Sequence, residues 1–155
     1  MSTTMITKDE LLQHWLGHRR LTRKTIEKFP EKELFEFSIG GMRTFSNLAG
    51  ELLALTGALK QVVTKQVEPY GHNAALTTKL EILKQWDEET PMISTYFDQI
   101  AEDSLHDTFM LFGQYEGTIL SHIMYFIDNE IHHRAQGFVY LRALGIEPPF
   151  FWDRF

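Results

Sequence analysis

Helix-stopping residues divide this chain into four long segments, and that division constrains the fold more than any other feature of the sequence. A capping box at Thr7–Glu10 begins the first segment, and Pro30 ends it. Pro69-Tyr70-Gly71 breaks the chain after the second segment, and Gly145 followed by Pro148-Pro149 stops the last one. Between these breaks, apolar residues recur with the period of an amphipathic helix. The pattern therefore predicts helices and no clear strand.

The expected helices lie at about residues 8–29, 44–65, 79–101 and 115–144. Pro91 should kink the third helix or split it in two. Residues 31–43 are predicted to form a loop with a turn at Gly40-Gly41, and residues 68–77 and 102–114 to connect the third helix to its neighbours. Long helices joined by extended crossover connections are typical of an all-α four-helix bundle, here a single domain over residues 1–155.

The composition argues against several classes of partner. The formal net charge is −6, and the densest basic stretch, His18–Lys24, is short, so we interpret it as a solvated helix face and expect no nucleic-acid binding. No apolar run approaches the roughly 18 residues of a membrane span, and no secretion signal is apparent, so we expect no membrane association. The absence of cysteine excludes disulfides and thiolate metal sites, and it fits a cytoplasmic protein.

A stripe of neutral polar side chains runs along one side of the predicted last helix. Its members recur every three to four residues: Tyr125, Asn129, His133, Gln136 and Tyr140. A solvent-facing stripe would normally carry Lys and Glu, so these groups are expected to hydrogen-bond inward or to hold a ligand. His132 lies about 100° around the helix from His133. We therefore expect His133, and not His132, to point into the bundle, with Asp128 and Glu130 facing solvent.

The second helix contributes a carboxylate beside its apolar face. Glu51 adjoins the row formed by Leu48, Leu52 and Leu55, and a carboxylate placed there needs a partner or a raised pKa. A metal ion or His133 would serve, and the alternative is a side chain at the edge of the row with its tip in water. We expect Glu51 to approach His133 within reach of a common ion or water.

Two other metal-site patterns are present. Glu130 and His133 have the E-x-x-H spacing of di-iron bundles, but such bundles need a second copy, and the nearest one, Asp103–His106, falls in a predicted connection. His14 and His18 are spaced to share one helix face, with no third ligand nearby. We interpret this pair as half-exposed helix residues, and His72 and His106 as polar loop residues.

The stretch from Asn129 to Pro149, NEIHHRAQGFVYLRALGIEPP, resembles the last-helix signature of the DinB/YfiT-like family, and MRTFSNLAGELLAL resembles its second helix. The resemblance covers nearly the whole chain. It implies a four-helix bundle of up-down-down-up topology, which in many members is a homodimer. It also implies a divalent metal, often nickel or zinc, held by three histidines. The matching positions here are Glu51, Asn129 and His133, so two of the three are not histidine.

The resemblance leaves two main functional hypotheses. In the first, the chain is a metal-dependent enzyme such as a low-molecular-weight thiol transferase, with metal ligands Glu51, Asn129 and His133 and with Tyr125 and Gln136 orienting the substrate. In the second, it is a metal-free or degenerate member that binds a small molecule or only dimerises. A bundle that binds a partner without any pocket chemistry is a third possibility. Whether the chain is an enzyme at all is left open.

The last residues of the chain are unusually aromatic. Phe150, Phe151, Trp152 and Phe155 lie within six positions. Left in water together, they would form an apolar patch of a kind that monomers rarely keep. We therefore predict that they pack against the bundle or against a second subunit.

Overall fold

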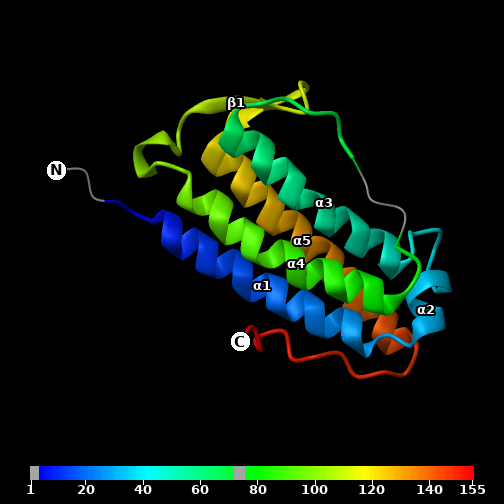
Figure 1. Ribbon diagram of the computed structural model, residues 1–155. Helices are drawn as coiled ribbons and strands as arrows, with labels where there is room; N and C mark the ends of the chain where they lie inside the picture. The colour runs from blue at the N-terminus through cyan, green and yellow to red at the C-terminus, as the bar shows by residue number, and fades with distance from the viewer. Residues whose placement is uncertain (1–3, 72–75) are drawn as a thin grey trace.

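The computed structural model describes residues 4–71 and 76–155, so the expectation for His72 lies outside the described residues. Within them the chain is mostly helical, with one small antiparallel hairpin (Figure 1). The elements are α1 (Lys8–Lys28), α2 (Glu31–Glu36), α3 (Phe45–Thr64), α4 (Lys79–Asp98), the short 3₁₀ helix η1 (Glu102–Ser104), β1 (Thr108–Leu111), β2 (Tyr115–Thr118) and α5 (Ile119–Ala143).

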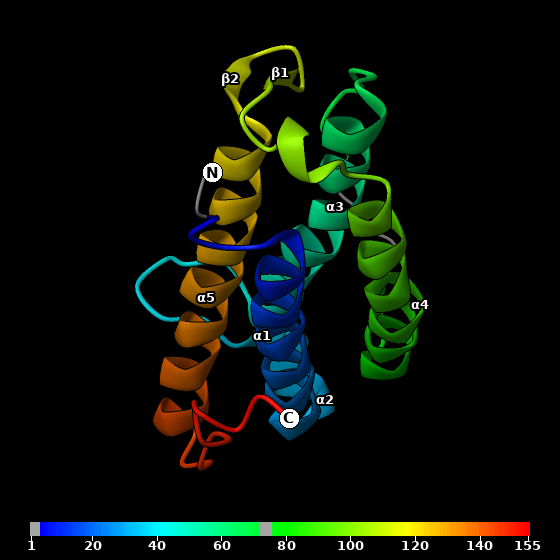
Figure 2. The same cartoon turned by 90° about the vertical axis from the view of Figure 1, so that its left-hand side faces the viewer.

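The four long helices form a bundle in which α1 and α3 each pack against both α4 and α5 (Figures 1 and 2). The ammonium of Lys8 donates to the carbonyl of Ile100, and that of Lys79 to the carbonyl of Phe29, so α1 and α4 run in opposite directions. The hydroxyl of Tyr140 donates to the carbonyl of Arg43, which places the end of α5 beside the start of α3. The expected all-α bundle of up-down-down-up topology is therefore confirmed.

The predicted helix signals act as expected at most ends. Thr7 and Glu10 form a reciprocal capping box at α1, and Thr78 forms another with Glu81 at α4. Gly145 takes the left-handed φ of 76° just beyond α5, where a side chain would cost about 1 kcal/mol. Pro91 does not split the third helix, which is continuous to Asp98. The carbonyl that a proline leaves unpaired four residues earlier belongs to Asp87, which is exposed, so water can satisfy it.

Two connections contain structure that the sequence analysis did not predict. Residues 31–36 form the short helix α2 instead of a loop, although the Gly40-Gly41 turn follows as expected. The predicted connection at 102–114 contains η1 and β1, and Tyr115 begins β2 instead of the last helix, which starts at Ile119. In β1, Phe109 and Leu111 point into the core and their neighbours point out, so the hairpin covers the end of the bundle.

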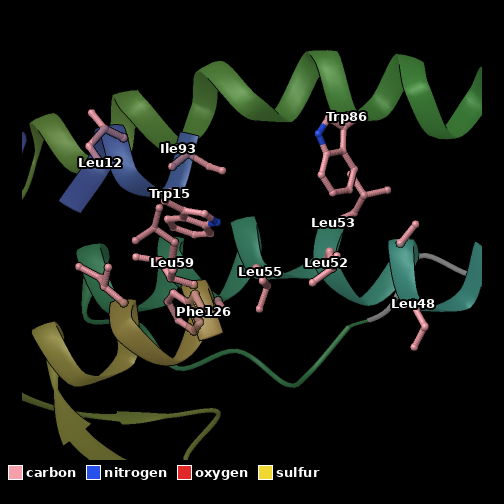
Figure 3. Packing of buried hydrophobic residues seen from close by; sticks show 14 of the residues in the cluster. Leu12, Trp15, Leu48, Leu52, Leu53, Leu55, Leu59, Trp86, Ile93 and Phe126 are labelled. Carbon is pink, nitrogen blue, oxygen red and sulfur yellow. The ribbon is translucent and has the colours of Figure 1, made fainter. Parts of the chain in front are cut away.

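The core runs along the bundle axis and receives large side chains from every long helix (Figure 3). Near the hairpin end, Trp15 of α1 packs against Phe97 of α4 and Phe126 of α5 at ring-centroid distances of 6.1 and 5.9 Å. Trp86 of α4 points towards α3 in the other half of the bundle. Each of these rings is almost completely buried, and an aromatic side chain removes about 150–250 Å² from water, so they are major contributors to stability.

A buried ion pair lies at the centre of this core and touches all four long helices. Arg19 of α1 and Glu130 of α5 are fully buried, with Arg19 Nη1 3.6 Å from Glu130 Oε1. Arg19 also donates to the carbonyl of Leu52 on α3, and its guanidinium stacks 3.7 Å from the ring centroid of Trp86 on α4. The expectation that Glu130 faces solvent was therefore wrong.

The basic stretch His18–Lys24 is likewise only partly solvated. Arg19 is buried, and so is His18, whose ring nitrogens lie 2.9 Å from Nη1 of Arg134 and 3.3 Å from Nη1 of Arg154. His14 of the same predicted pair remains exposed. The sequence around a basic residue in a helix does not show whether a residue far along the chain will pair with it and bury it. The interpretation of this stretch as one solvated face was therefore wrong.

The aromatic tail does not pack on its own bundle. Phe150, Phe151, Trp152 and Phe155 are 58%, 64%, 60% and 91% exposed, although the tail backbone lies along α1. The part of the prediction that placed these rings on the bundle was therefore wrong. The part that placed them on a second subunit is a proposal taken up below. Among residues 4–71 and 76–155, no helix is both long and apolar enough to cross a membrane.

Adding a methyl group at two helical glycines should have opposite effects. A Cβ at Gly137 would clash with the ring of Phe45, where α5 approaches α3, whereas a Cβ at Gly57 meets no described residue within 4 Å. We expect Gly137→Ala to lower the free energy of unfolding by about 1–3 kcal/mol through overpacking. Gly57→Ala should raise it by about 0.5–1 kcal/mol through helix propensity. Urea unfolding of both variants tests this, and equal effects would contradict the close packing.

The buried His18 should make stability depend on pH. Burial, together with the positive charges of Arg134, His14 and Arg154, lowers the pKa of His18 to about 3. The unfolded chain binds a proton near its ordinary pKa of about 6.5 while the folded chain does not, so stability falls as pH drops from about 6.5 towards 3. Between pH 7 and 4.5 we expect His18→Gln to lose roughly 2 kcal/mol less than the parent protein in urea unfolding. Equal losses would show that His18 binds a proton in the fold.

Candidate functional site

Glu51, Asn129 and His133 meet between α3 and α5. The Nε2 atom of His133 lies 3.3 Å from Glu51 Oε1, and the Asn129 amide nitrogen lies 3.5 Å from the same oxygen. The residues on α5 are one helical turn apart, so a single face of α5 presents both to α3. His133 is buried and His132 is exposed, as the helix phase predicted. The sequence-predicted trio is thus brought together around one carboxylate oxygen.

The other carboxylate oxygen of Glu51 is held by a residue that the sequence analysis missed. Nη1 of Arg43, in the loop before α3, lies 2.6 Å from Glu51 Oε2. Burial alone would raise the pKa of Glu51, but the hydrogen bond from Arg43 and the charges of His133 and Arg43 outweigh it and lower that pKa below its usual range. Glu51 is therefore a carboxylate at neutral pH.

Both nitrogens of the His133 ring are occupied by protein groups. Nδ1 lies 2.7 Å from Oε1 of Gln136, whose amide nitrogen lies 3.4 Å from the sulfur of Met42. Nε2 faces Glu51 as described. Gln136, which was expected to orient a substrate, hydrogen-bonds the His133 ring and so orients it. Tyr140, expected on the same polar stripe, is buried and binds the carbonyl of Arg43, so it anchors the loop that carries the arginine.

A cavity of about 710 Å³ opens next to this cluster. Its lining comes from α3, α5, the hairpin and the segment after α3, and it includes Glu51, Asn129 and Tyr125 but neither His133 nor Gln136. The volume is in the range of small-molecule sites, about 300–1,000 Å³. Five aromatic rings contribute to the lining: Tyr70, Phe112, Tyr115, Tyr125 and Phe126. The five predicted site residues therefore divide into three that line the cavity and two that lie behind them.

The charged side chains of the lining are all acidic. Among residues 4–71 and 76–155 they are Glu51 on α3 and Glu116 on β2, with no lysine or arginine. Tyr70 stacks edge to face on Phe112, and its burial and the nearby Glu51 carboxylate raise its pKa. His122 also lines the cavity, where its Nε2–H donates to the carbonyl of Phe109 at 2.9 Å. Neither Tyr70 nor His122 was distinguishable in the sequence, because each becomes a wall residue only when the hairpin covers the bundle.

Among the described residues, neither alternative metal pattern forms a set of three ligands, although the rings of His14 and His18 lie 4.7 Å apart. Glu130 accepts hydrogen bonds from Trp15 at 3.1 Å and Thr22 at 2.8 Å in the centre of the core, on the side of α5 that faces α1. Its E-x-x-H pattern with His133 therefore spans two different environments. Across residues 4–71 and 76–155, no three histidine, aspartate or glutamate side chains are arranged to hold a metal ion.

The protein is a helical bundle with a polar cluster between its second and last long helices, and comparison with known proteins shows which family it belongs to. The sequence matches the DinB family over residues 1–153, so the chain belongs to the DinB family. A DinB-like protein from Bacillus cereus ATCC 10987 has a similar fold, with a TM-score of 0.77 and 18% identity over 93% of this chain and 97% of that one. A DinB-like protein from Bacillus subtilis also has a similar fold, with a TM-score of 0.73 and 21% identity over 93% of this chain and 98% of that one. No curated protein matches the chain.

The donor groups at Glu51, Asn129 and His133 do not fit a resident nickel or zinc ion. Zinc sites use three or four protein ligands, chiefly imidazole and thiolate nitrogen and sulfur with some carboxylate. Here one imidazole is present, Asn129 presents its amide nitrogen, and Arg43 already occupies one oxygen of Glu51.

Replacing Glu51 and Asn129, the two positions that are not histidine, should create a metal site. We expect the parent protein, with tags removed, to show no saturable uptake of Zn²⁺ or Ni²⁺ in calorimetric titration. Glu51→His combined with Asn129→His supplies three imidazoles around the same point and removes the partner of Arg43, so this variant should bind one equivalent. Adding His133→Ala should abolish that binding, whereas adding His132→Ala should not. If the parent protein bound one equivalent, the conclusion that Glu51, Asn129 and His133 do not hold Zn²⁺ or Ni²⁺ would be wrong.

Proposed function

We propose that this DinB-family chain binds a small amine in the 710 Å³ cavity, with Glu51 as the anchoring carboxylate and with no resident metal ion. The observation that carries the proposal is the state of Glu51 Oε1. Its two protein contacts are long, 3.3 and 3.5 Å, while Arg43 satisfies only Oε2. A half-buried carboxylate oxygen with weak partners at a cavity wall favours a ligand that donates a hydrogen bond.

The rest of the lining supports a cationic head group on an apolar body. Aromatic faces attract an ammonium group by cation–π interaction, and Glu116 adds a second negative charge. Because the charged side chains of the described lining are the carboxylates of Glu51 and Glu116, a carboxylate or phosphate ligand would be repelled. Leu55, Ala58 and Leu111 provide apolar surface for a hydrocarbon or aromatic body.

In this proposal the groups behind Glu51 are positioning residues. Arg43 fixes one carboxylate oxygen, and the His133 ring, held by Gln136, fixes the direction of the other. Asn129 and Tyr125 line the cavity and can contact the ligand. The metal-dependent thiol transferase suggested by the family resemblance is less well supported, because both nitrogens of His133 and one oxygen of Glu51 are already engaged.

A matched series of probes tests the proposal. We use 2-phenylethylamine, 2-phenylethanol and 3-phenylpropanoate, which share a body and differ in head group. At pH 7 the amine should bind about tenfold more tightly than the alcohol, and the carboxylate should not bind measurably. Amide chemical-shift changes should concentrate in residues 111–116 and around Asn129. Glu51→Gln should weaken amine binding about tenfold and leave alcohol binding unchanged.

The control is Glu88→Gln, which removes an exposed carboxylate of α4 that lies outside the cavity lining. This variant should bind all three probes as the parent protein does. Binding of the alcohol as tightly as the amine would keep the cavity as a ligand site but overturn the choice of an amine. Shift changes that map elsewhere, or none with any probe, would overturn the site itself.

A further inference from the structure

The C-terminal tail presents a row of aromatic rings to solvent on a backbone that is firmly attached to α1. The side chains of Phe150, Phe151, Trp152 and Phe155 are more than half exposed. The rings of Phe150 and Trp152 are stacked at 4.9 Å and within 7° of parallel, and Phe151 meets Trp152 edge to face. We call these four residues the tail platform. Such a contiguous aromatic surface is typical of a protein contact site.

Polar contacts hold the tail in place from beneath. Nε of Arg20 donates to the carbonyl of Arg154 at 2.8 Å, and Lys24 donates to the carbonyl of Phe155 at 2.7 Å. Lys24 also forms an ion pair of 2.9 Å with Asp153. Because Arg154 turns inward to His18 while its aromatic neighbours turn outward, the platform is presented in one orientation. Little conformational entropy then remains to be lost on association.

We infer that the tail platform is the contact surface between two copies of this chain. The hollow beside it, of about 500 Å³, is lined by Pro148, Pro149 and Phe150 together with both basic and acidic side chains. Those charged side chains are Lys24, Lys28, Glu27, Glu147 and Asp153. A surface that carries both signs around an aromatic centre is complementary to itself. Lys24 already pairs with Asp153 within one copy, and Glu27 with Arg23, so a two-fold axis can pair Lys28 of one copy with Glu147 of the other.

The area available is sufficient for such a contact. An aromatic side chain offers about 150–250 Å², so the exposed parts of the four rings supply roughly 500 Å² per copy. A specific interface buries about 800 Å² per partner, and the rim of prolines and charged side chains around the hollow can provide the remainder. Tryptophan is also among the residues that most often dominate binding energy, which makes Trp152 the expected centre of the contact.

The test is the mass of the full chain in solution, measured by sedimentation velocity from roughly 1 to 100 μM. The parent protein, whose monomer is 18.1 kDa, should sediment as a dimer at the upper end of this range. Phe151→Ala combined with Trp152→Ala should be monomeric throughout, and its melting temperature at the lowest concentration should equal that of the parent. The matched control, Met110→Ala, removes an exposed apolar side chain from the hairpin and should remain dimeric.

A second readout follows the platform directly. Trp15 and Trp86 are buried within the bundle, so a blue shift of tryptophan emission on raising the concentration reports on Trp152. The shift should accompany dimer formation and be absent from the double variant. A parent protein that stays monomeric at the highest concentration, or a double variant that still dimerises, would overturn the inference. Species larger than a dimer would overturn its closed two-fold form.

Discussion

The buried pair of Arg19 and Glu130 is the interaction on which the rest of the structure depends. A charge moved into the core costs several kcal/mol unless it is paired and hydrogen-bonded. Arg19 and Glu130 can therefore be buried only where their side chains are close together. Trp15 and Thr22 donate hydrogen bonds to the Glu130 carboxylate. The Arg19 guanidinium donates to the carbonyl of Leu52 and stacks on the ring of Trp86. Residues of all four long helices thus meet at one point. A purely apolar core would tolerate rotation or sliding of a helix far more readily.

That pairing also sets the face of α5 that meets α3. With Glu130 directed towards α1, a helix of 3.6 residues per turn carries Asn129 and His133 to the neighbouring side, and it carries His132 outward. Glu51 lies beside the apolar row of α3, and this position directs its side chain to the same contact between α3 and α5, where it approaches Asn129 and His133. The candidate site is therefore a consequence of core geometry, and Arg43 completes it from a loop that Tyr140 holds in place.

The sequence predicted what depends on local chemistry. Thr7 and Gly145 mark helix ends because capping and a left-handed φ involve only nearby backbone. The inward position of His133 followed from helix phase. The burial of Arg19 and Glu130 did not, because a charged residue in a helix is ordinarily exposed, and only its distant partner changes that. The hairpin was missed because its two strands are four residues each, and the turn between them uses Phe112 at a φ of 56°. Tyr70 and Arg43 likewise acquire roles only through tertiary contacts.

The same ion pair determines when during synthesis the bundle can become complete. Trp15 and Glu130, which share a hydrogen bond, are 115 residues apart in the chain, and α1 and α5 are parallel neighbours formed from its two ends. While only the first three long helices have left the ribosome, Arg19 has no carboxylate within the core, and the groove that α5 will fill still exposes Trp15 and the leucines of α3 to water. Contacts so distant in sequence form late and slow folding. We therefore expect a nascent chain that stops before α5 to be much less stable than the complete bundle, because the contacts of α5 with α1 and α3 are missing.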